Sequence, residues 1–428
     1  MSIKKENPKV NFVKNEHEIL DYWSKNKTFE KLVEKNSNGP KWSFLDGPIT
    51  ANNPMGVHHA WGRTLKDLYQ RYKSMNGHQL RYQNGFDCQG LWVEIEVEKE
   101  LGIKSKKEVE DLGIEKFVNL CKERVEKFSE VQKDQSIRLG YWMDWDNSYF
   151  TMSEENNYAI WAFLKKLHED GKIYRGTDVV PWSGRSGTSY SQMEIIEGRK
   201  LTVHKGVFVK FPLKDKENEN ILIWTTTPWT LSSNIAVAVN KKINYAKIKA
   251  NDGSIYFVAE TNLKYQRLNK EFAEKKNWVD GVPKLKTLDQ IFKERGGYEI
   301  LEVIKGEKLI GLTYQGPFDH LEPQSSKGGY PIHDTSNLQD KSAIDCHIII
   351  DGGKDSEGND MVVEGEGTGF VHMAGGCGAI DNKICKREGF VEISPIDNQA
   401  NFIQGFDFMS GLSVTDPETA QKIISNLK

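Results

Sequence analysis

The 428-residue sequence predicts an α/β protein in which an incomplete nucleotide-binding domain is followed by an inserted, β-rich, barrel-like domain. Three observations predict this fold. Residues 42–67 read as an apolar strand, a loop rich in Gly, Pro and Asn, and a helix, which places ligands beyond the carboxyl end of a strand. From about residue 200 short β-type runs, among them residues 207–211, 221–224 and 255–258, alternate with polar turns. The first sheet still lacks strands at that point, which indicates an insertion.

Length and composition set the domain organisation and exclude some classes of protein. We expect an N-terminal helical segment (1–40), the first half of the nucleotide-binding domain (41–195) and the inserted domain (196–428). A hydrophobic content of 38% suffices for sizeable cores, and a net charge of −3 argues against non-specific coating of nucleic acid. Five cysteines without C-x-x-C spacing predict reduced thiols. With no signal peptide and no apolar run of membrane-spanning length, the sequence predicts a cytoplasmic protein without membrane contact.

The first domain divides into helices and strands by its apolar periodicity. We expect an amphipathic helix over 15–34, a strand from Trp42 to Leu45, and a helix after the loop whose register is set by Leu65, Leu68 and Tyr72. A strand over 78–82, a loop over 84–91 and a helix from about residue 93 follow. The glutamates at 94, 96, 98 and 100 are expected on a solvated face. Long helices are predicted over 114–139 and 154–170, with a buried aromatic loop between them.

The loop after the first strand carries the first candidate site. Its chemistry-bearing residues are Pro48, Asn52, Gly56, His58 and His59. Two adjacent histidines at a helix start can donate hydrogen bonds to phosphate oxygens, and a glycine lets a ligand approach the backbone. The alternative is that the loop is structural and the histidines are solvated or cap the helix.

A second candidate lies in the segment GFDCQGLWVE, residues 85–94. Asp87 stands among glycines where a strand gives way to a helix, so its carboxylate could pair with a substrate ammonium group. Capping the following helix is an equally good explanation from the sequence.

These segments together resemble class I aminoacyl-tRNA synthetases of the isoleucine type. Gly56-Val57-His58-His59 is similar to the HIGH signature, and residues 85–94 resemble the isoleucyl-tRNA synthetase segment GWDCHGLPVE. The resemblance implies a Rossmann-type catalytic domain that binds ATP with Mg²⁺, with His58 and His59 at the ATP. It also implies that Asp87 holds the α-ammonium of isoleucine near Pro48. Gln89 stands where the family usually has His.

Two clusters of the second domain carry a further candidate site. One is the segment WTTTPWTLSSN, residues 224–234, and the other is residues 366–374, which lead to Asp381. Alone, the threonines are ordinary strand residues, His372 a core histidine and Asp381 a helix cap. Together they resemble the editing domain of isoleucyl-, valyl- and leucyl-tRNA synthetases. That likeness implies that Asp381 anchors the ammonium of a mischarged amino acid, while its pocket residues place the water: Trp224, Thr225, Thr226, Thr227 and His372.

Two absences complete the sequence-based interpretation. Ser183 and Ser186 stand where the family often has C-x-x-C, so we expect no zinc there. No KMSKS loop or anticodon domain is found, so we expect an N-terminal fragment of an enzyme that is monomeric in full-length form. The expected reaction charges tRNA(Ile) with isoleucine and hydrolyses mischarged Val-tRNA(Ile). The alternatives are the same chemistry with valine or leucine, or a non-catalytic fragment that binds tRNA or nucleotide.

Overall fold

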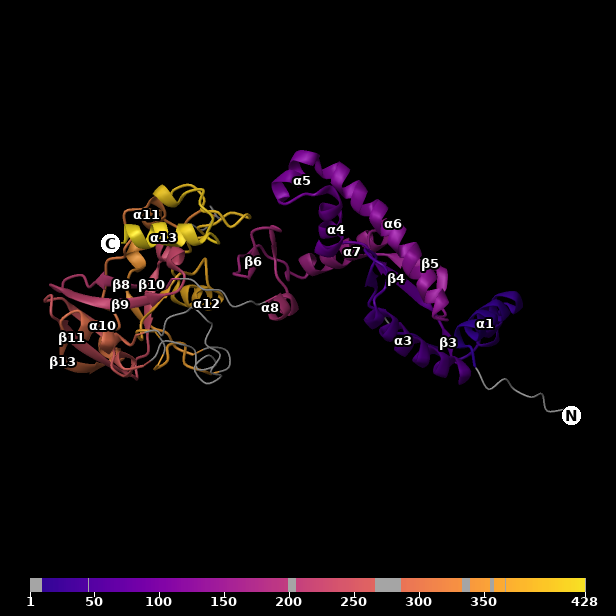
Figure 1. Cartoon of the computed structure of the whole chain (residues 1–428), viewed down its shortest axis with the longest axis horizontal. Coiled ribbons are helices and arrows are strands. Elements are labelled where there is room, and N and C mark those ends of the chain that lie inside the picture. Colours follow the sequence, from indigo (N-terminus) through magenta and orange to yellow (C-terminus); the bar gives the residue numbers. More distant parts are fainter. Residues whose placement is uncertain are drawn as a thin grey trace. The chain divides into compact units, whose positions relative to one another are not determined.

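The computed structural model of the chain describes residues 10–44, 46–198, 205–265, 286–332, 339–354, 358–365 and 367–427. Leu45 and Glu366, which the sequence analysis placed in a strand and in a site segment, lie outside the described residues. The chain forms two compact units, Met1–Arg175 and Gly176–Lys428 (Figure 1). Each unit has its own sheets and its own core, so each is described by itself.

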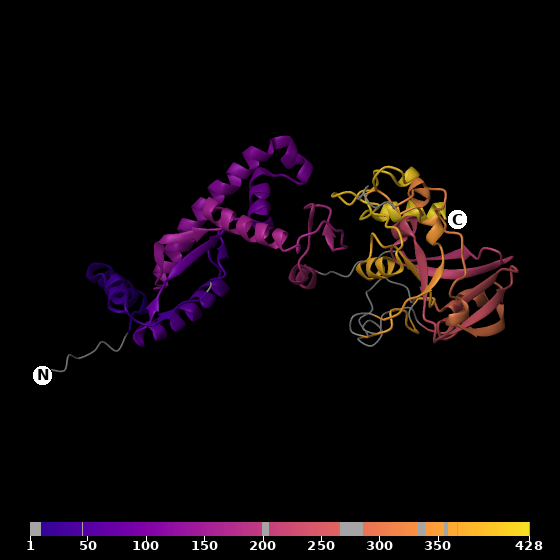
Figure 2. The ribbon, with the colours of Figure 1, turned by 180° about the vertical axis from the view of Figure 1, so that it is seen from behind.

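The first unit contains a small parallel sheet covered by helices. Strands β2, β4 and β5 pair in parallel in that order, and β1 pairs in parallel with β3, which agrees with the predicted nucleotide-binding half-sheet. Figures 1 and 2 show α3 on one side of β4 and β5 and α6 on the other. The elements are α1 (Phe12–Asn26), α2 (Thr28–Lys35), β1 (Lys41–Trp42), β2 (Ile49–Thr50), α3 (Val57–Met75), β3 (Gln79–Leu80), β4 (Gln83–Asp87), α4 (Leu91–Leu101), α5 (Lys106–Leu112), α6 (Ile114–Arg138), β5 (Asp144–Phe150) and α7 (Glu154–Glu169).

The face of α3 that packs on the sheet differs from the predicted one. Leu65, Leu68 and Tyr72 are 46%, 62% and 58% exposed, so they do not set the helix register. Polar residues occupy the buried face instead. The Arg63 guanidinium donates to Asn84 Oδ1 at 3.1 Å and lies over the Tyr141 ring, while the Ser74 hydroxyl and carbonyl accept from the Asn36 amide. Helix α3 therefore carries an apolar face that no described residue buries, here called the α3 face: Trp61, Leu65, Leu68, Tyr69 and Tyr72.

Three predicted boundaries in this unit are wrong. The helix expected over 15–34 is two helices, because Lys27 adopts a left-handed conformation at φ 49° and interrupts the helical hydrogen bonding. The first strand is shorter than predicted and ends at Trp42. The loop expected from residue 84 is a strand through Asp87, because residues 83–87 pair with both β2 and β5.

The second unit contains two main sheets rather than a closed barrel. Five strands pair in the order β13-β11-β12-β9-β8, and three pair in the order β14-β10-β15. Among the described residues the sheets form no closed barrel, but backbone hydrogen bonds of residues 312–315 connect the end of β8 to the start of β14. The barrel-like form expected from the sequence therefore stays a prediction. The strands are β6 (Trp182–Ser183), β7 (Thr188–Ser189), β8 (Val207–Pro212), β9 (Glu219–Thr225), β10 (Ala236–Val239), β11 (Asn244–Ala250), β12 (Ile255–Ala259), β13 (Tyr298–Lys305), β14 (Ile349–Asp351) and β15 (Val371–Met373).

Short helices and 3₁₀ turns connect these strands. The largest hydrophobic cluster of the second unit lies between the two sheets' inner residues and α12 and α13, and its members include Phe211, Ile223, Val237 and Ile423. The helices are α8 (Gln192–Gly198), α10 (Leu288–Glu294), α11 (Glu322–Ser325), α12 (Ala379–Glu388) and α13 (Pro417–Asn426), and the turn η1 (Pro228–Ser233) follows β9. Among the helices that the structure describes, none is long and apolar enough to cross a membrane.

A hairpin at the start of the second unit packs onto that unit's C-terminal part. Strands β6 and β7 pair antiparallel, and the Trp182 indole Nε1 donates to the carbonyl of Asn398 at 2.9 Å. The Lys386 ammonium also donates to the carbonyl of Thr177 at 2.6 Å. Gly184 lies so close to Gln399 that a Cβ there would be 2.5 Å from its carbonyl oxygen. Residues 177–184 thus belong structurally with residues near 386–400.

Candidate functional site

Three strand ends in the first unit converge on Asp87. Thr50 at the end of β2 pairs with Asp87 at the end of β4, and Thr151 follows the end of β5. The Thr50 hydroxyl donates to Asp87 Oδ2 at 2.9 Å, and the Thr151 hydroxyl lies 3.4 Å from Oδ1. Helix α4 begins after Gly90, and no side chain caps it. Asp87 therefore caps no helix; its carboxylate is oriented from both sides and remains half-buried beside the sheet's carboxyl edge.

The two histidines at the start of α3 differ in their surroundings. The backbone N–H of Gly56 donates to His59 Nδ1 at 3.1 Å, which leaves the proton of a neutral ring on Nε2. Burial lowers the pKa of His59, and the nearby His58 and Arg63 lower it further. The exposed His58 ring lies with its centroid 3.9 Å from that of His59 and folds against Gly56, where a Cβ would be 2.9 Å from its Cε1. His59 is thus a neutral Nε2–H donor.

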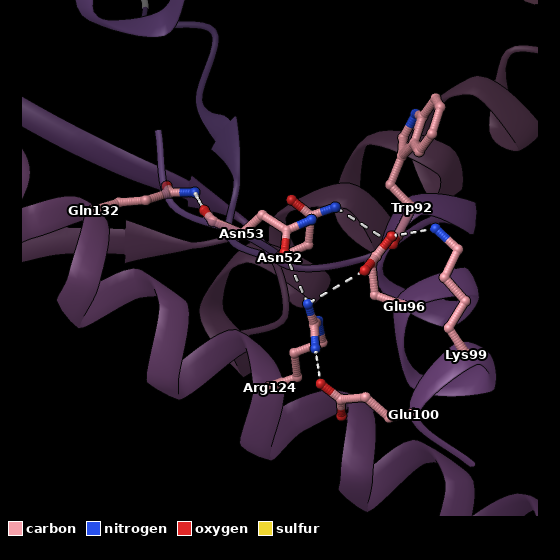
Figure 3. A network of polar contacts seen from close by, with 8 residues as sticks. All are labelled: Asn52, Asn53, Trp92, Glu96, Lys99, Glu100, Arg124 and Gln132. Carbon is pink, nitrogen blue, oxygen red and sulfur yellow. Dashed lines mark hydrogen bonds and ion pairs between the residues drawn. The ribbon is translucent and has the colours of Figure 1, made fainter. Parts of the chain in front are cut away.

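The loop between β2 and α3 is held in place by side chains of α6 (Figure 3). The Gln132 amide donates to the carbonyls of Thr50 and Asn53, both at 2.9 Å, and Arg124 donates to Asn53 Oδ1 at 2.9 Å. Gln135 Oε1 accepts from the Met55 N–H at 2.7 Å. A loop held at this many points can present its free groups in a fixed geometry.

Arg124 also links the loop to α4. It pairs with Glu100 and, at 3.6 Å, with Glu96, whose carboxylate meets Lys99 at 2.7 Å (Figure 3). Two of the four glutamates expected on a solvated face therefore belong to an ion-pair network. Glu94 and Glu98 both pair with Lys106 of α5.

The other predicted residues of the first unit are Asn52, Pro48 and Gln89. Asn52 Nδ2 donates to the carbonyl of Trp92 at 3.3 Å, which ties the loop to the first turn of α4. Pro48 is half-buried just before β2, and Gln89 is exposed between β4 and α4. The structure thus brings Asn52, Gly56, His59 and Asp87 to one edge of the sheet.

The second unit brings the threonine segment and His372 together, in what we call the histidine pocket: Thr225, Thr227, Thr230 and His372. Thr225 Oγ1 accepts from the Thr227 N–H at 3.1 Å and lies 3.3 Å from its hydroxyl. Thr230 Oγ1 lies 3.0 Å from His372 Nε2. Of the other residues predicted in this segment, Trp224 is half-buried and Thr226 is exposed.

Hydrogen bonding in this pocket fixes the tautomer of His372. The Thr230 hydroxyl donates its only proton to the carbonyl of Thr227 at 2.9 Å, so it must accept from His372 Nε2–H. His372 Nδ1 then carries a lone pair, is buried, and has no hydrogen-bond partner among the described residues. Burial lowers the pKa of His372 to about 4, so the ring is neutral at pH 7. A buried nitrogen of this kind calls for an explanation, such as a ligand or a water molecule that it binds.

Asp381 lies in the first turn of α12 and is joined to the strand that carries His372. Its Oδ2 accepts from the N–H of Ala374 at 3.0 Å, and the helix itself is preceded by Gly378. Burial raises the pKa of Asp381 to about 6, which marks a carboxylate short of a positive partner. The loop before it is tightly packed, because a Cβ at Gly376 would lie 2.0 Å from the carbonyl oxygen of Ile393.

The segment predicted to lack zinc forms a tight turn. The Ser186 N–H donates to the buried Ser183 hydroxyl at 3.2 Å, within the hairpin of β6 and β7. The two residues thus lie close together, but neutral hydroxyls are poor zinc ligands. The absence of zinc remains a prediction from these donors.

Comparison with known proteins gives the family. Residues 18–298 match the family model described as tRNA synthetases class I (I, L, M and V). The chain belongs to this class I tRNA synthetase family.

Curated relatives of this class I synthetase chain are isoleucine--tRNA ligases. That of Clostridium tetani is 35% identical over 403 residues, 94% of this chain and 34% of the relative. That of Sulfolobus acidocaldarius is 34% identical over 419 residues, 97% of this chain and 35% of the relative. The chain thus spans about a third of their length. The Agrobacterium radiobacter LeuRS in its ternary LeuRS-tRNA-LeuAMS complex is 17% identical, with a TM-score of 0.34, covering 53% of this chain and 33% of that one.

Three residues of these candidate sites were missed by the sequence analysis. Thr50 and Thr151 orient Asp87, and Thr230 fixes the tautomer of His372. Thr50 stands at the end of β2 and Thr151 just after β5, two strands that the sequence analysis did not predict, and Thr230 lies within the quoted threonine segment. Threonine is a common strand residue and its partner strand is unknown from sequence, so its residue type alone is a weak signal.

Proposed function

We propose that the chain is part of an isoleucine--tRNA ligase that activates isoleucine with ATP, charges tRNA(Ile), and hydrolyses mischarged Val-tRNA(Ile). The observation that carries this proposal is the 35% identity to the Clostridium tetani isoleucine--tRNA ligase over 94% of this chain. That similarity includes the segments that carry Asp87, His59, His372 and Asp381.

In the proposed synthetic site the strand ends hold the amino acid. The hydroxyls of Thr50 and Thr151 donate to the Asp87 carboxylate and fix its direction. That carboxylate, at the open edge of the sheet, binds the α-ammonium of isoleucine, with Pro48 beside the side chain. His59 Nε2–H donates to a phosphate oxygen of ATP, while bound Mg²⁺ would neutralise phosphate charge.

In the proposed editing site the bare nitrogen of His372 is the central group. Nδ1 accepts a hydrogen bond from the hydrolytic water or from a ribose hydroxyl of the tRNA end. Asp381 binds the ammonium of the valyl group, which restores the positive partner that its raised pKa indicates it lacks. The exposed residues Thr226 and Thr227 offer hydroxyls that contact the esterified ribose.

Two sites are needed because a pocket built for isoleucine cannot exclude valine efficiently. One methylene contributes only about 1–3 kcal/mol of discrimination, and isoleucine against valine is the standard example. A second, hydrolytic pocket that accepts valine but excludes isoleucine multiplies the selectivity.

The proposal includes partners and compartment. The partners are tRNA(Ile), isoleucine and ATP, the location is cytoplasmic, and the full-length form is monomeric. The competing proposals are a valine- or leucine-specific synthetase and a non-catalytic fragment. The specificity alternative is tested in the full-length protein by amino-acid-dependent pyrophosphate exchange, where faster exchange with valine than with isoleucine would exclude the isoleucine assignment.

The test on this chain is deacylation. We expect the chain to release valine from Val-tRNA(Ile) at least tenfold faster than isoleucine from Ile-tRNA(Ile). Asp381→Ala abolishes this release, whereas Glu388→Ala, which removes an exposed carboxylate at the other end of α12, leaves it unchanged. Deacylation that is absent, or equal for both substrates, would contradict the editing proposal and support the binding fragment.

A further inference from the structure

A cluster of buried polar side chains lies behind the turn that carries Thr230. Three residues from separate segments, Tyr314, Gln324 and His347, converge on Asn234, and all four are at most 2% exposed. The Tyr314 hydroxyl donates to Asn234 Oδ1 at 2.7 Å. Gln324 Nε2 donates to the carbonyls of Ser232 at 2.9 Å and Asn234 at 3.1 Å. We call these four residues the Asn234 cluster.

His347 completes the cluster from a third direction. Its Nε2 lies 3.3 Å from the carbonyl oxygen of Asn234, which can only accept, so this nitrogen donates. Its ring stacks on Tyr314 at 5.0 Å and 12°, and its Nδ1 lies 3.4 Å from Asp319 Oδ1. The Asn234 carbonyl thus accepts from Gln324 and His347 together, which restrains one backbone position from two sides.

Residues 232–234 connect the segment that carries the pocket threonines to β10, which pairs with the strand of His372. The turn η1, which contains Thr230, ends at Ser233, and β10 begins at Ala236. Strand β10 pairs with β15, where Val237 is opposite His372. A shift of residues 232–234 therefore moves Thr230 relative to the strand that carries His372, and the 3.0 Å contact between them is lost.

We propose that Gln324, with Tyr314 and His347, is a positioning residue for deacylation. Among the described residues, none of the three hydrogen-bonds to the histidine pocket; they act through the backbone of residues 232–234. Gln324 is the clearest member, because its amide bridges two successive turn carbonyls from α11. This inference rests on the proposed editing function, and it adds a group of residues that sets the geometry of that site.

The decisive variant removes the bridge but keeps the volume. Gln324→Met deletes both donors with a side chain of similar length. The control is Ile248→Val, which lies in a separate hydrophobic cluster of the same unit and lowers stability without touching the turn. Both are compared with the unchanged full chain in deacylation of Val-tRNA(Ile), at temperatures well below their melting points.

The expected result is a selective loss in the chemical step. We expect Gln324→Met to lower kcat tenfold to a hundredfold, the range that a misplacement of about 1 Å produces, with KM changed less than twofold. Ile248→Val retains the kcat of the unchanged chain. A Gln324→Met protein with full kcat, or with a kcat loss that the control shares, would overturn the inference.

A second measurement does not depend on activity. The ¹⁵N resonances of the His372 ring report its tautomer and its pKa, which burial lowers to about 4. In Gln324→Met we expect Nε2 to lose its fixed proton and the pKa to rise by about one unit as water reaches the ring. An unchanged His372 titration would refute the positioning role even if the chain did not deacylate. An inactive unchanged chain with a shifted His372 titration in the variant would instead reject the editing proposal alone.

Discussion

The buried Asp381 carboxylate is expected to lower the free energy of unfolding when no ligand is bound. The variant Asp381→Asn measures by how much. Burial raises the pKa of this carboxyl from 3.8 to about 6, a change of about two units. At about 1.36 kcal/mol per unit this is about 3 kcal/mol of penalty above pH 6. Asparagine keeps an acceptor for the N–H of Ala374, and its buried amide costs about 1 kcal/mol. We therefore expect a net gain of roughly 2 kcal/mol at pH 8.

The pH dependence has a definite sign. Between about pH 4 and 6 the native carboxyl holds a proton that the unfolded chain has released, so the unfolding free energy of the unchanged protein falls as pH rises. The gain in unfolding free energy from Asp381→Asn is therefore absent below pH 4 and complete above pH 6. For a unit of this size the gain corresponds to a Tm increase of roughly 4–8 °C at pH 8.

Thermal melting at pH 4 and pH 8 checks this. The matched control is Asp289→Asn, because hydrogen bonds from Lys293 and Tyr298 lower the pKa of Asp289, so its loss should reduce stability at pH 8. The reasoning is wrong if Asp381→Asn lowers the Tm at pH 8, or if its effect is equal at both pH values.

Three further predictions follow from other contacts. Thr50→Val removes a hydroxyl that donates to Asp87, and calorimetry should show isoleucine binding weakened by about 1.5–3 kcal/mol; unchanged affinity would exclude this orienting role. Gly376→Ala places a Cβ against a carbonyl oxygen, so the second unit should unfold several degrees lower, whereas Gly47→Ala, which has open space, should melt unchanged. Trp61→Gln on the α3 face should raise solubility without lowering Tm, and a lower Tm in melting experiments would show that the ring is packed.

Some strands of the second unit were predictable because apolar side chains follow one another along them. Strand β10 is buried throughout, whereas β13, which is exposed along most of its length, was not predicted. The run expected at 207–211 is β8, and that expected at 255–258 is β12, each within one residue. Burial on both sides produces continuous apolar runs, which sequence alone reveals. The order in which the strands pair was not predictable, because it depends on which strands meet in the folded chain.

The candidate sites were predictable as segments but not as contacts. Asp87 and His372 stand in recognisable sequence surroundings. The hydrogen bonds of Asp87 with Thr50 and of His372 with Thr230 depend on the fold and could not be predicted. The orientation of α3 failed for a related reason. Its buried face is chosen by Arg63 reaching Asn84, a contact across 21 residues, while periodicity counts only apolar side chains.

The hairpin of β6 and β7 has a practical consequence for dissecting the protein. An excised second unit that began near residue 196 would remove Trp182 from the carbonyl of Asn398 and Thr177 from Lys386. It would expose residues near 386–400 to solvent, so we expect proteases to cut there. A version that starts at Gly176 keeps these contacts. Limited proteolysis of the two versions would show where the shorter one is cut.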